Sequence, residues 1–250
     1  MLKLFFVLLL NRIDVFFEAD NLPHQLAVTI SHANSSLDIA FHQIYQDEVV
    51  DSLISAHSRG VRIRVITEHD YYDRTYELRA QGIPVVDEFN DPDAREHRMH
   101  NKFIVIDYWD SDTSNDAVWN GSYNASSAIH ADNAVLIRSH ALASIFEAEF
   151  NQMWGDTGVT PNPENARTGP NKSDVAPFHI VNVDGIEIEV YFSPQDNPAE
   201  KISYVVSDAT SSIDFCMFYF TRDDIASTMS DRLDSENRAC HSWCSQYHPS

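Results

Sequence analysis

The sequence predicts an α/β fold in which a mixed β-sheet is sandwiched between helices. Three observations support this prediction. Apolar, strand-like runs alternate with amphipathic, helix-like segments along most of the 250 residues, an order typical of a sheet covered on both faces. Hydrophobic residues make up 43% of the chain, which is enough to bury a core. The chain also contains an internal repeat of a strand–helix–strand unit.

The first repeat unit begins with a short aromatic strand at 15–17 and continues into an amphipathic helix. The apolar positions of this helix lie near helical spacing and form one face: Leu22, Leu26, Ile30 and Ala33. The chain then turns at a Ser-Ser pair, 35–36, into another apolar strand.

Helices and strands continue to alternate after this unit. A helix is expected over 47–58, and Gly60 is suited to end it because glycine tolerates a left-handed backbone. Residues 61–67 alternate as a half-buried strand does. The remaining elements are expected in this order: a helix at 72–81, strands at 83–86, 103–106, 117–120 and 134–137, and a helix over 145–154.

The repeat relates residues 15–39 to residues 190–215. Both copies contain the string Ala-x-Ser-Ser-(Leu/Ile)-Asp, and both are expected to begin with a short aromatic strand. Between the copies, prolines lie among Asn, Thr, Gly and Asp, a composition typical of a connector. We therefore expect four segments: an apolar N-terminal segment at 1–13, a first repeat at 14–155, a linker at 156–178, and the start of a second repeat at 179–250.

Both ends of the sequence need an interpretation. The apolar run at 4–10 fits either the core of a clipped export signal or a first buried strand, so the sequence leaves the compartment open. No stretch is long enough to span a bilayer. By the register of the repeat, the counterpart of Gly60 falls near 236–237. Neither a glycine stop nor an alternating strand is evident there, and we interpret the last dozen residues as a truncated or frame-shifted end of the second repeat. A competing interpretation is a metal site, for which this segment offers zinc ligand types in Cys240, His241, Cys244 and His248 but no second ligand cluster.

The residues suited to chemistry begin with His100 and Lys102, which precede a buried apolar strand. Residues two apart in an extended chain project to the same face. Neutral imidazole is a competent nucleophile near neutral pH, and an ammonium group can bind a phosphate oxygen. The pair is therefore typical of phosphoryl chemistry.

A second group of polar residues follows the next strand. Gly121 permits a close approach of the backbone, and Ser122 and Asn124 offer hydrogen-bond donors to a phosphate. Asp132 precedes a further buried strand and is suited to accept the second ring N–H of a catalytic histidine.

Together these motifs, HNKFIVID, GSYN and ADNAVLI, resemble the signature of the phospholipase D superfamily. The resemblance extends over 15–154 and resumes without a signature over 190–230. It implies that His100 attacks phosphorus and forms a phosphohistidine, and that Lys102 binds phosphate oxygens. It also implies that Asn124, with Ser122 nearby, donates to the same oxygens. Asp132 would orient His100, although the family more often has glutamate there.

Asp107 completes the His-x-Lys-x4-Asp motif and is counted with its catalytic residues. Its position at the end of a strand favours a structural role, in which it ties down the following turn. The resemblance implies no metal and no cofactor, and we find no carboxylate cluster suited to a two-metal site in the sequence.

The family needs two half-sites, one histidine as nucleophile and the other as general acid and base. This sequence contains one half-site. The resemblance therefore implies either a homodimer that completes the site, or an inactive fragment or scaffold of a two-repeat enzyme whose second His-x-Lys would follow Ser250.

The charge of the chain bears on its substrate. The formal net charge is -21, so generic binding to duplex nucleic acid and adsorption to an anionic membrane are disfavoured. We therefore expect a phospholipase D-type phosphodiesterase that favours phospholipid head groups. A nuclease of the same superfamily is the alternative substrate class, and the sequence does not distinguish hydrolysis from transfer to an alcohol.

Overall fold

The computed structural model describes residues 11–68, 74–86, 99–126, 131–217, 220–236 and 239–242. The apolar run at 4–10 lies outside these residues, so both interpretations of it stay predictions. The chain divides into two compact units, Met1–Val190 and Tyr191–Ser250. No helix among the described residues is both long and apolar enough to cross a membrane.

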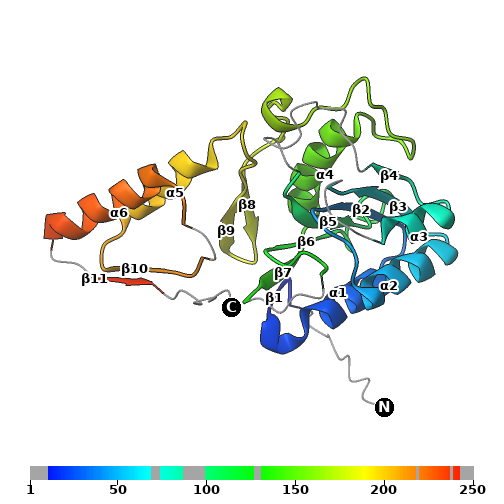
Figure 1. Ribbon diagram of the computed structural model, residues 1–250, viewed down its shortest axis with the longest axis horizontal. Coiled ribbons are helices and arrows are strands. Elements are labelled where there is room, and N and C mark those ends of the chain that lie inside the picture. Colours follow the sequence, from blue (N-terminus) through cyan, green and yellow to red (C-terminus); the bar gives the residue numbers. More distant parts are fainter. Residues whose placement is uncertain are drawn as a thin grey trace, which may run out of the picture. The chain divides into compact units, whose positions relative to one another are not determined.

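The first unit is built on a seven-stranded mixed sheet with the order β1-β7-β6-β5-β2-β3-β4 (Figure 1). The pairs β2–β3 and β3–β4 are parallel, and the other four pairs are antiparallel. The strands are β1 (Ile13–Phe17), β2 (Ser36–Phe41), β3 (Arg62–Ile66), β4 (Val85–Val86), β5 (Lys102–Ile106), β6 (Ala117–Gly121) and β7 (Asn133–Arg138).

Helices cover both faces of this sheet, which confirms the predicted α/β fold class (Figure 1). The α-helices are α1 (Leu22–Ser31), α2 (Asp47–Ser58), α3 (Thr75–Ala80) and α4 (His140–Trp154). Two short 3-10 helices are η1 (Glu18–Asp20) and η2 (Gly169–Asn171). Gly60 has a φ of 95°, as expected for the glycine after α2. The hydroxyl of Ser139 accepts a hydrogen bond from the backbone of Leu142 and so caps α4.

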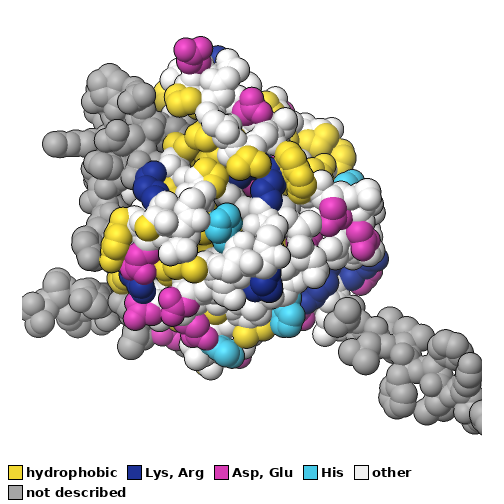
Figure 2. All heavy atoms as spheres, turned by 90° about the vertical axis from the view of Figure 1, so that its right-hand side faces the viewer, with side chains coloured by type: hydrophobic (Ala, Val, Ile, Leu, Met, Phe, Trp, Pro, Cys, Tyr) yellow, Lys and Arg dark blue, Asp and Glu magenta, His cyan; other side chains and the backbone are white. Residues whose placement is uncertain are grey.

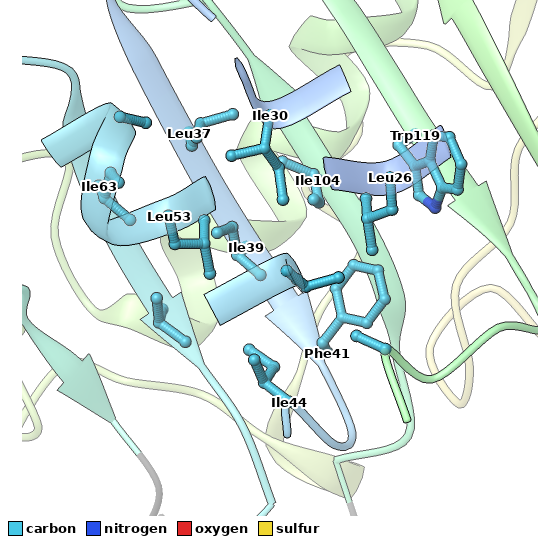
Figure 3. Close-up of a cluster of buried hydrophobic side chains, with 14 of the residues drawn as sticks. Leu26, Ile30, Leu37, Ile39, Phe41, Ile44, Leu53, Ile63, Ile104 and Trp119 are labelled. Carbon is cyan, nitrogen blue, oxygen red and sulfur yellow. The ribbon is translucent and has the colours of Figure 1, made fainter. Parts of the chain in front are cut away.

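The main core lies between the sheet and the helices α1 and α2 (Figure 3). Alternate residues of the central strands point into it because side chains on a strand alternate between faces. In β2 these are Leu37, Ile39 and Phe41, all nearly inaccessible to solvent. Leu26 and Ile30 of α1 pack on them, as the helical spacing predicts.

The opposite face of the sheet packs on α4 and contains buried charges. Arg64 of β3 donates to Asp38 of β2 at 2.6 Å and to Glu147 of α4 at 2.9 Å. The side chains of Asp38 and Arg64 are completely buried. Arg64 also donates to the carbonyl oxygen of Gly158 at 3.1 Å, and its guanidinium lies over the ring of Phe150. These contacts join two strands, α4 and the following loop.

The connector after α4 packs on the first unit and leads to a hairpin of β8 (Ile180–Val183) and β9 (Ile186–Glu189). Lys172 of the connector forms an ion pair with Glu149 at 2.7 Å. The hairpin belongs to the first compact unit. The repeat limits predicted from the sequence stay a prediction, because compactness does not define a repeat.

The second unit contains α5 (Pro198–Asp208), β10 (Ser212–Phe215), α6 (Asp223–Glu236) and β11 (Ala239–Ser242). Strands β10 and β11 are parallel, as β2 and β3 are, and the order of elements repeats α1-β2-α2-β3. The expectation that no strand follows α6 is therefore wrong. Backbone pairing with β10 makes this segment a strand although apolar and polar residue types do not alternate along its sequence.

The aromatic strand expected at the start of the second copy is also absent. Residues 190–192 are not a strand, whereas β1 is one because β7 pairs with it. The backbone N–H of Val190 donates to the carbonyl of His179, and that of Phe192 donates to the carboxylate of Asp196, so these donors serve local contacts rather than a strand ladder.

Candidate functional site

Four neighbouring strands meet at one end of the sheet in the first unit. Strands β2 and β6 end there, and β5 and β7 begin there, because these neighbours are antiparallel. The register places Phe41 beside Lys102 and Gly121 beside Ala134. Phe41 and Lys102 are 61 positions apart in the sequence and Gly121 and Ala134 are 13 apart, so the antiparallel order brings distant segments to one place.

His100 and Lys102 lie together at this end, as their spacing predicts. The Nζ atom of Lys102 lies 3.3 Å from Nδ1 and 3.4 Å from Nε2 of His100. It also donates to the backbone carbonyl of His100 at 2.9 Å. His100 is exposed, whereas Lys102 is only 8% exposed. A ring that solvent can reach thus lies against a cation that is held inside the protein.

The charge of Lys102 is costly in this position. Burial lowers the pKa of Lys102 to about 8, and the nearby carboxylate of Asp132 opposes the shift. A lysine that has lost much of its hydration gains more from a bound anion than an exposed lysine does. The geometry is therefore suited to an anionic group beside His100.

Ser122 and Asp132 form a second part of the site. The hydroxyl of Ser122 donates to Asp132 at 2.7 Å and accepts from the backbone N–H of Asn133 at 3.1 Å. Gly121 makes this pairing possible, because a Cβ atom there would lie 2.2 Å from the carbonyl oxygen of Asn133. The close backbone approach predicted for Gly121 is therefore observed.

The hydrogen-bond partner that the structure gives for Asp132 is the hydroxyl of Ser122. Its carboxylate also acts on the charge of Lys102, which lies beside His100. The predicted contact of Asp132 with His100 stays a prediction.

Asn124 lies beyond the end of β6, in a segment that packs beside the end of β2. The carbonyl of the next residue, Ala125, accepts hydrogen bonds from the backbone of Tyr45 and Gln46. The Oδ1 atom of Asn124 is buried without a hydrogen-bond partner among the described residues. The structure gives no contact of Asn124 with His100 or Lys102, so its predicted phosphate contact stays a prediction.

Asp107 lies at the other end of β5, away from His100. Its carboxylate accepts hydrogen bonds from the backbone amides of Asn34, Ser35 and Ser36 at 2.8–3.2 Å. It also accepts from the side chain of Asn115 at 3.2 Å. These contacts tie the turn before β2 to the end of β5. They fit the structural role favoured for Asp107 and place it at the opposite end of β5 from His100 and Lys102.

Sequence reasoning missed two residues beside His100. His42 follows β2 and is 4% exposed, and its ring centroid lies 4.5 Å from that of His100. Glu68 follows β3 and accepts a hydrogen bond from the backbone N–H of Met99 at 2.8 Å. Neither residue belongs to a local motif with His100. Only the strand order β5-β2-β3 brings them together.

The residues around His100 suit an anion rather than a metal ion. Among the described residues, the groups at this end of the sheet are two imidazoles, an ammonium, hydroxyl and amide groups, and two carboxylates. Of these carboxylates, Asp132 acts on Lys102 and Glu68 accepts a hydrogen bond from the backbone N–H of Met99. Hard cations prefer several carboxylate and carbonyl oxygens, whereas phosphates prefer cationic and N–H donors.

Comparison with known proteins gives relatives that match about half of this chain. The mitochondrial cardiolipin hydrolase of Chlamydomonas reinhardtii is 27% identical over 134 residues, which cover 50% of this chain and 54% of that protein. The protein of the same name from Xenopus tropicalis is 26% identical over 146 residues, with 53% and 64% covered. The chain thus spans between half and two thirds of the length of these relatives.

A solved structure shares the fold over more of the chain. The phosphatidylserine synthase of Haemophilus influenzae superposes with a TM-score of 0.62 and covers 93% of this chain and 61% of its own. At 12% identity this likeness concerns the fold alone. Residues 26–154, just over half of the chain, match the family described as cardiolipin synthase, PLD-like domain. By this match, and by the motifs that it contains, the chain belongs to the phospholipase D superfamily.

Proposed function

We propose that this chain is a phospholipase D-type phosphodiesterase in which His100 is the nucleophile. The observation that supports the proposal most directly is the contact of Lys102 with the ring of His100, 3.3 Å away at the end of β5. A phosphate that His100 attacks would lie beside the ammonium of Lys102. The cation would then stabilise the negative charge that grows on the phosphate oxygens in the transition state.

The reaction takes place in two displacements at phosphorus. A ring nitrogen of His100 attacks phosphorus, the bond to the head-group oxygen breaks, and a second histidine protonates that oxygen. Water then attacks the phosphohistidine and gives a proton to the second histidine, and the phosphorus–nitrogen bond breaks. Ser122 and Asp132 hold the strand ends around Lys102, and Asn124 donates to the phosphate once the substrate is bound.

The second histidine comes from a second copy of the chain. A general acid must lie on the side of phosphorus opposite the nucleophile, because the attacking nitrogen, the phosphorus and the leaving oxygen are roughly in line. A symmetric dimer would place two His100 side chains on either side of one phosphate. Activity per chain is therefore expected to rise with protein concentration.

A phospholipid diester is the favoured substrate. The two relatives named above are called cardiolipin hydrolases, and the net charge of -21 disfavours a polyanionic substrate. On the face that Figure 2 shows, basic side chains are interspersed with acidic, apolar and neutral ones over the residues described there. The same charge opposes adsorption to an anionic bilayer, so the lipid is best offered in neutral detergent micelles.

Trapping the covalent intermediate tests the proposal. The chain is incubated with cardiolipin in neutral micelles and quenched with alkali, which preserves a phosphorus–nitrogen bond, and the peptides are analysed by mass spectrometry. We expect a phosphatidyl adduct on His100 and release of phosphatidic acid. Phosphatidylcholine and single-stranded DNA serve as parallel substrates. Turnover of DNA alone would refute the assignment of a lipid substrate. If neither an adduct nor turnover is seen up to millimolar protein, the proposal that the chain is a phosphodiesterase is refuted.

The pH dependence of the reaction provides a second prediction. The pKa of Lys102 is lowered to about 8, so Lys102 loses its charge as the pH rises through that value. The neutral amine no longer stabilises the negative charge on the phosphate oxygens. We therefore expect kcat/KM, which reports the free enzyme, to fall on the alkaline side with a midpoint near pH 8.

Lys102→Arg is the matched variant, because guanidinium stays charged throughout this range. We expect the variant to be slower, since the buried position fits lysine, and to lose the part of the alkaline fall that comes from Lys102, while the part that comes from the protonated second histidine remains. The profile is measured with Lys172→Arg as a control, because the side chain of Lys172 is also buried but is paired with Glu149 instead of contacting His100. An alkaline fall that persists unchanged in Lys102→Arg would assign it to another group.

A further inference from the structure

We propose that His42 is a positioning residue that sets the orientation of the nucleophile His100. This inference rests on the proposed function and adds a residue that lies outside the His-x-Lys and Gly-Ser-x-Asn motifs. His42 comes from the end of β2, and His100 from the segment before β5. The two strands are neighbours in the sheet.

The rings of His42 and His100 are in direct contact. Their centroids are 4.5 Å apart and their planes are inclined at 61°, an edge-to-face arrangement. His42 is 4% exposed, whereas His100 is exposed. One side of the nucleophile ring therefore rests on a buried ring, and Lys102 limits it from another direction at 3.3 Å. Rotation of His100 would break at least one of these contacts.

His42 is itself anchored to the backbone on both sides of His100. Its Nδ1 lies 2.9 Å from the carbonyl oxygen of Met99, and its backbone N–H donates to the carbonyl of Asn101 at 2.9 Å. A carbonyl oxygen can only accept, so Nδ1 of His42 carries the proton. The ring that supports His100 is thus tied to the residue before it and the residue after it.

Met99 itself is held by a residue that follows a third strand, β3. The backbone N–H of Met99 donates to Glu68, which follows β3 and is 7% exposed. The hydroxyl of Thr67 donates to the carbonyl of His42 at 3.4 Å. The ends of β2, β3 and β5 therefore form one rigid support, and His42 is the part of it that contacts the reacting ring.

Orientation of a nucleophile affects the rate more than substrate affinity. Misplacement by about 1 Å can cost on the order of 100-fold in rate, while contacts to the substrate stay intact. We therefore expect His42→Ala to lower kcat by roughly 10- to 100-fold with KM changed less than about twofold. His32→Ala is the control, because His32 is exposed after α1 and lies near the start of β2 rather than its end.

Two conservative variants separate the ring contact from the anchor. His42→Phe keeps a ring without the donor, and His42→Asn places an amide N–H near Nδ1 without the ring. We expect each to retain a kcat between those of the wild type and His42→Ala. Circular dichroism shows whether His42→Ala folds. If it does not, the kcat values of His42→Phe and His42→Asn test the proposal instead, and a wild-type kcat in both would overturn it. A kcat of folded His42→Ala within twofold of wild type would overturn it as well.

The tautomer of His42 is measured on the wild-type chain and needs no activity. Long-range 1H–15N spectra are expected to show His42 protonated at Nδ1, and a proton at Nε2 alone would contradict the anchor to Met99. The outcomes are distinguishable. A wild-type adduct on His100 with unchanged kinetics in the His42 variants refutes only the positioning role, whereas no adduct on wild-type His100 refutes the proposed function.

Discussion

Replacement of His100 by Asn lowers kcat by on the order of 1,000-fold or more, if the proposed function is correct. A nucleophile that forms the covalent intermediate has no substitute, because the asparagine amide is not nucleophilic. A 1,000-fold loss corresponds to about 4 kcal/mol of transition-state stabilisation. Asparagine is close in size to imidazole, and His100 is exposed, so we expect the free energy of unfolding to change little.

The measurement compares initial rates of phosphatidic acid release for His100→Asn, His32→Asn and the wild type. His32 is exposed and outside the site, so its variant should retain the wild-type rate. Adding an excess of His100→Asn to the wild type should also lower the wild-type rate, since mixed dimers lack one of the two histidines. Activity of His100→Asn within tenfold of the wild type would refute the phosphohistidine mechanism.

Replacement of Arg64 by Met is expected to destabilise the first unit by roughly 3–5 kcal/mol. The variant keeps most of the apolar stem but removes the guanidinium that pairs Asp38 with Glu147. Asp38 is fully buried and cannot recover its hydration, so its charge would be left uncompensated. Burial and the nearby Asp38 already raise the pKa of Glu147 to about 7.

Urea unfolding at pH 8 measures this effect. Glu147 is then largely ionised, so Arg64→Met causes its largest decrease in the free energy of unfolding. Arg12→Met is the control, since its pair with Asp184 is exposed and spans 3.5 Å, and we expect a change within about 1 kcal/mol. Adding Glu147→Gln to Arg64→Met should recover part of the loss by removing one buried charge. A loss below about 1 kcal/mol in Arg64→Met would show that the network does not stabilise the fold.

The elements that the sequence predicted well are governed by local interactions. Helix α2 has the predicted limits, and Gly60 has the left-handed backbone expected after it. Spacing alone also predicted that His100 and Lys102 lie together, because two residues of one extended segment project to one side. Such features depend on residues that are close in sequence, so the pattern of residue types is enough to predict them.

The features that the sequence did not predict depend on which strands are adjacent. Strand β11 forms although its residues do not alternate, since β10 offers it a backbone partner. The hydroxyl of Ser122 donates to Asp132, because the neighbouring strands β6 and β7 bring the two residues together. Arg64 meets Asp38 and Glu147 from three separate elements, and no local pattern marks that network.

By itself the sequence determined the α/β class, the motif residues and the kind of chemistry that they suit. The tertiary structure decided which side chains touch His100, and it placed His42 there in addition to Lys102. The physical reason is the range of the interactions involved. Helix periodicity and strand alternation act over a few residues, whereas the order of antiparallel strands brings together residues 58 positions apart, as the contact of His42 with His100 shows.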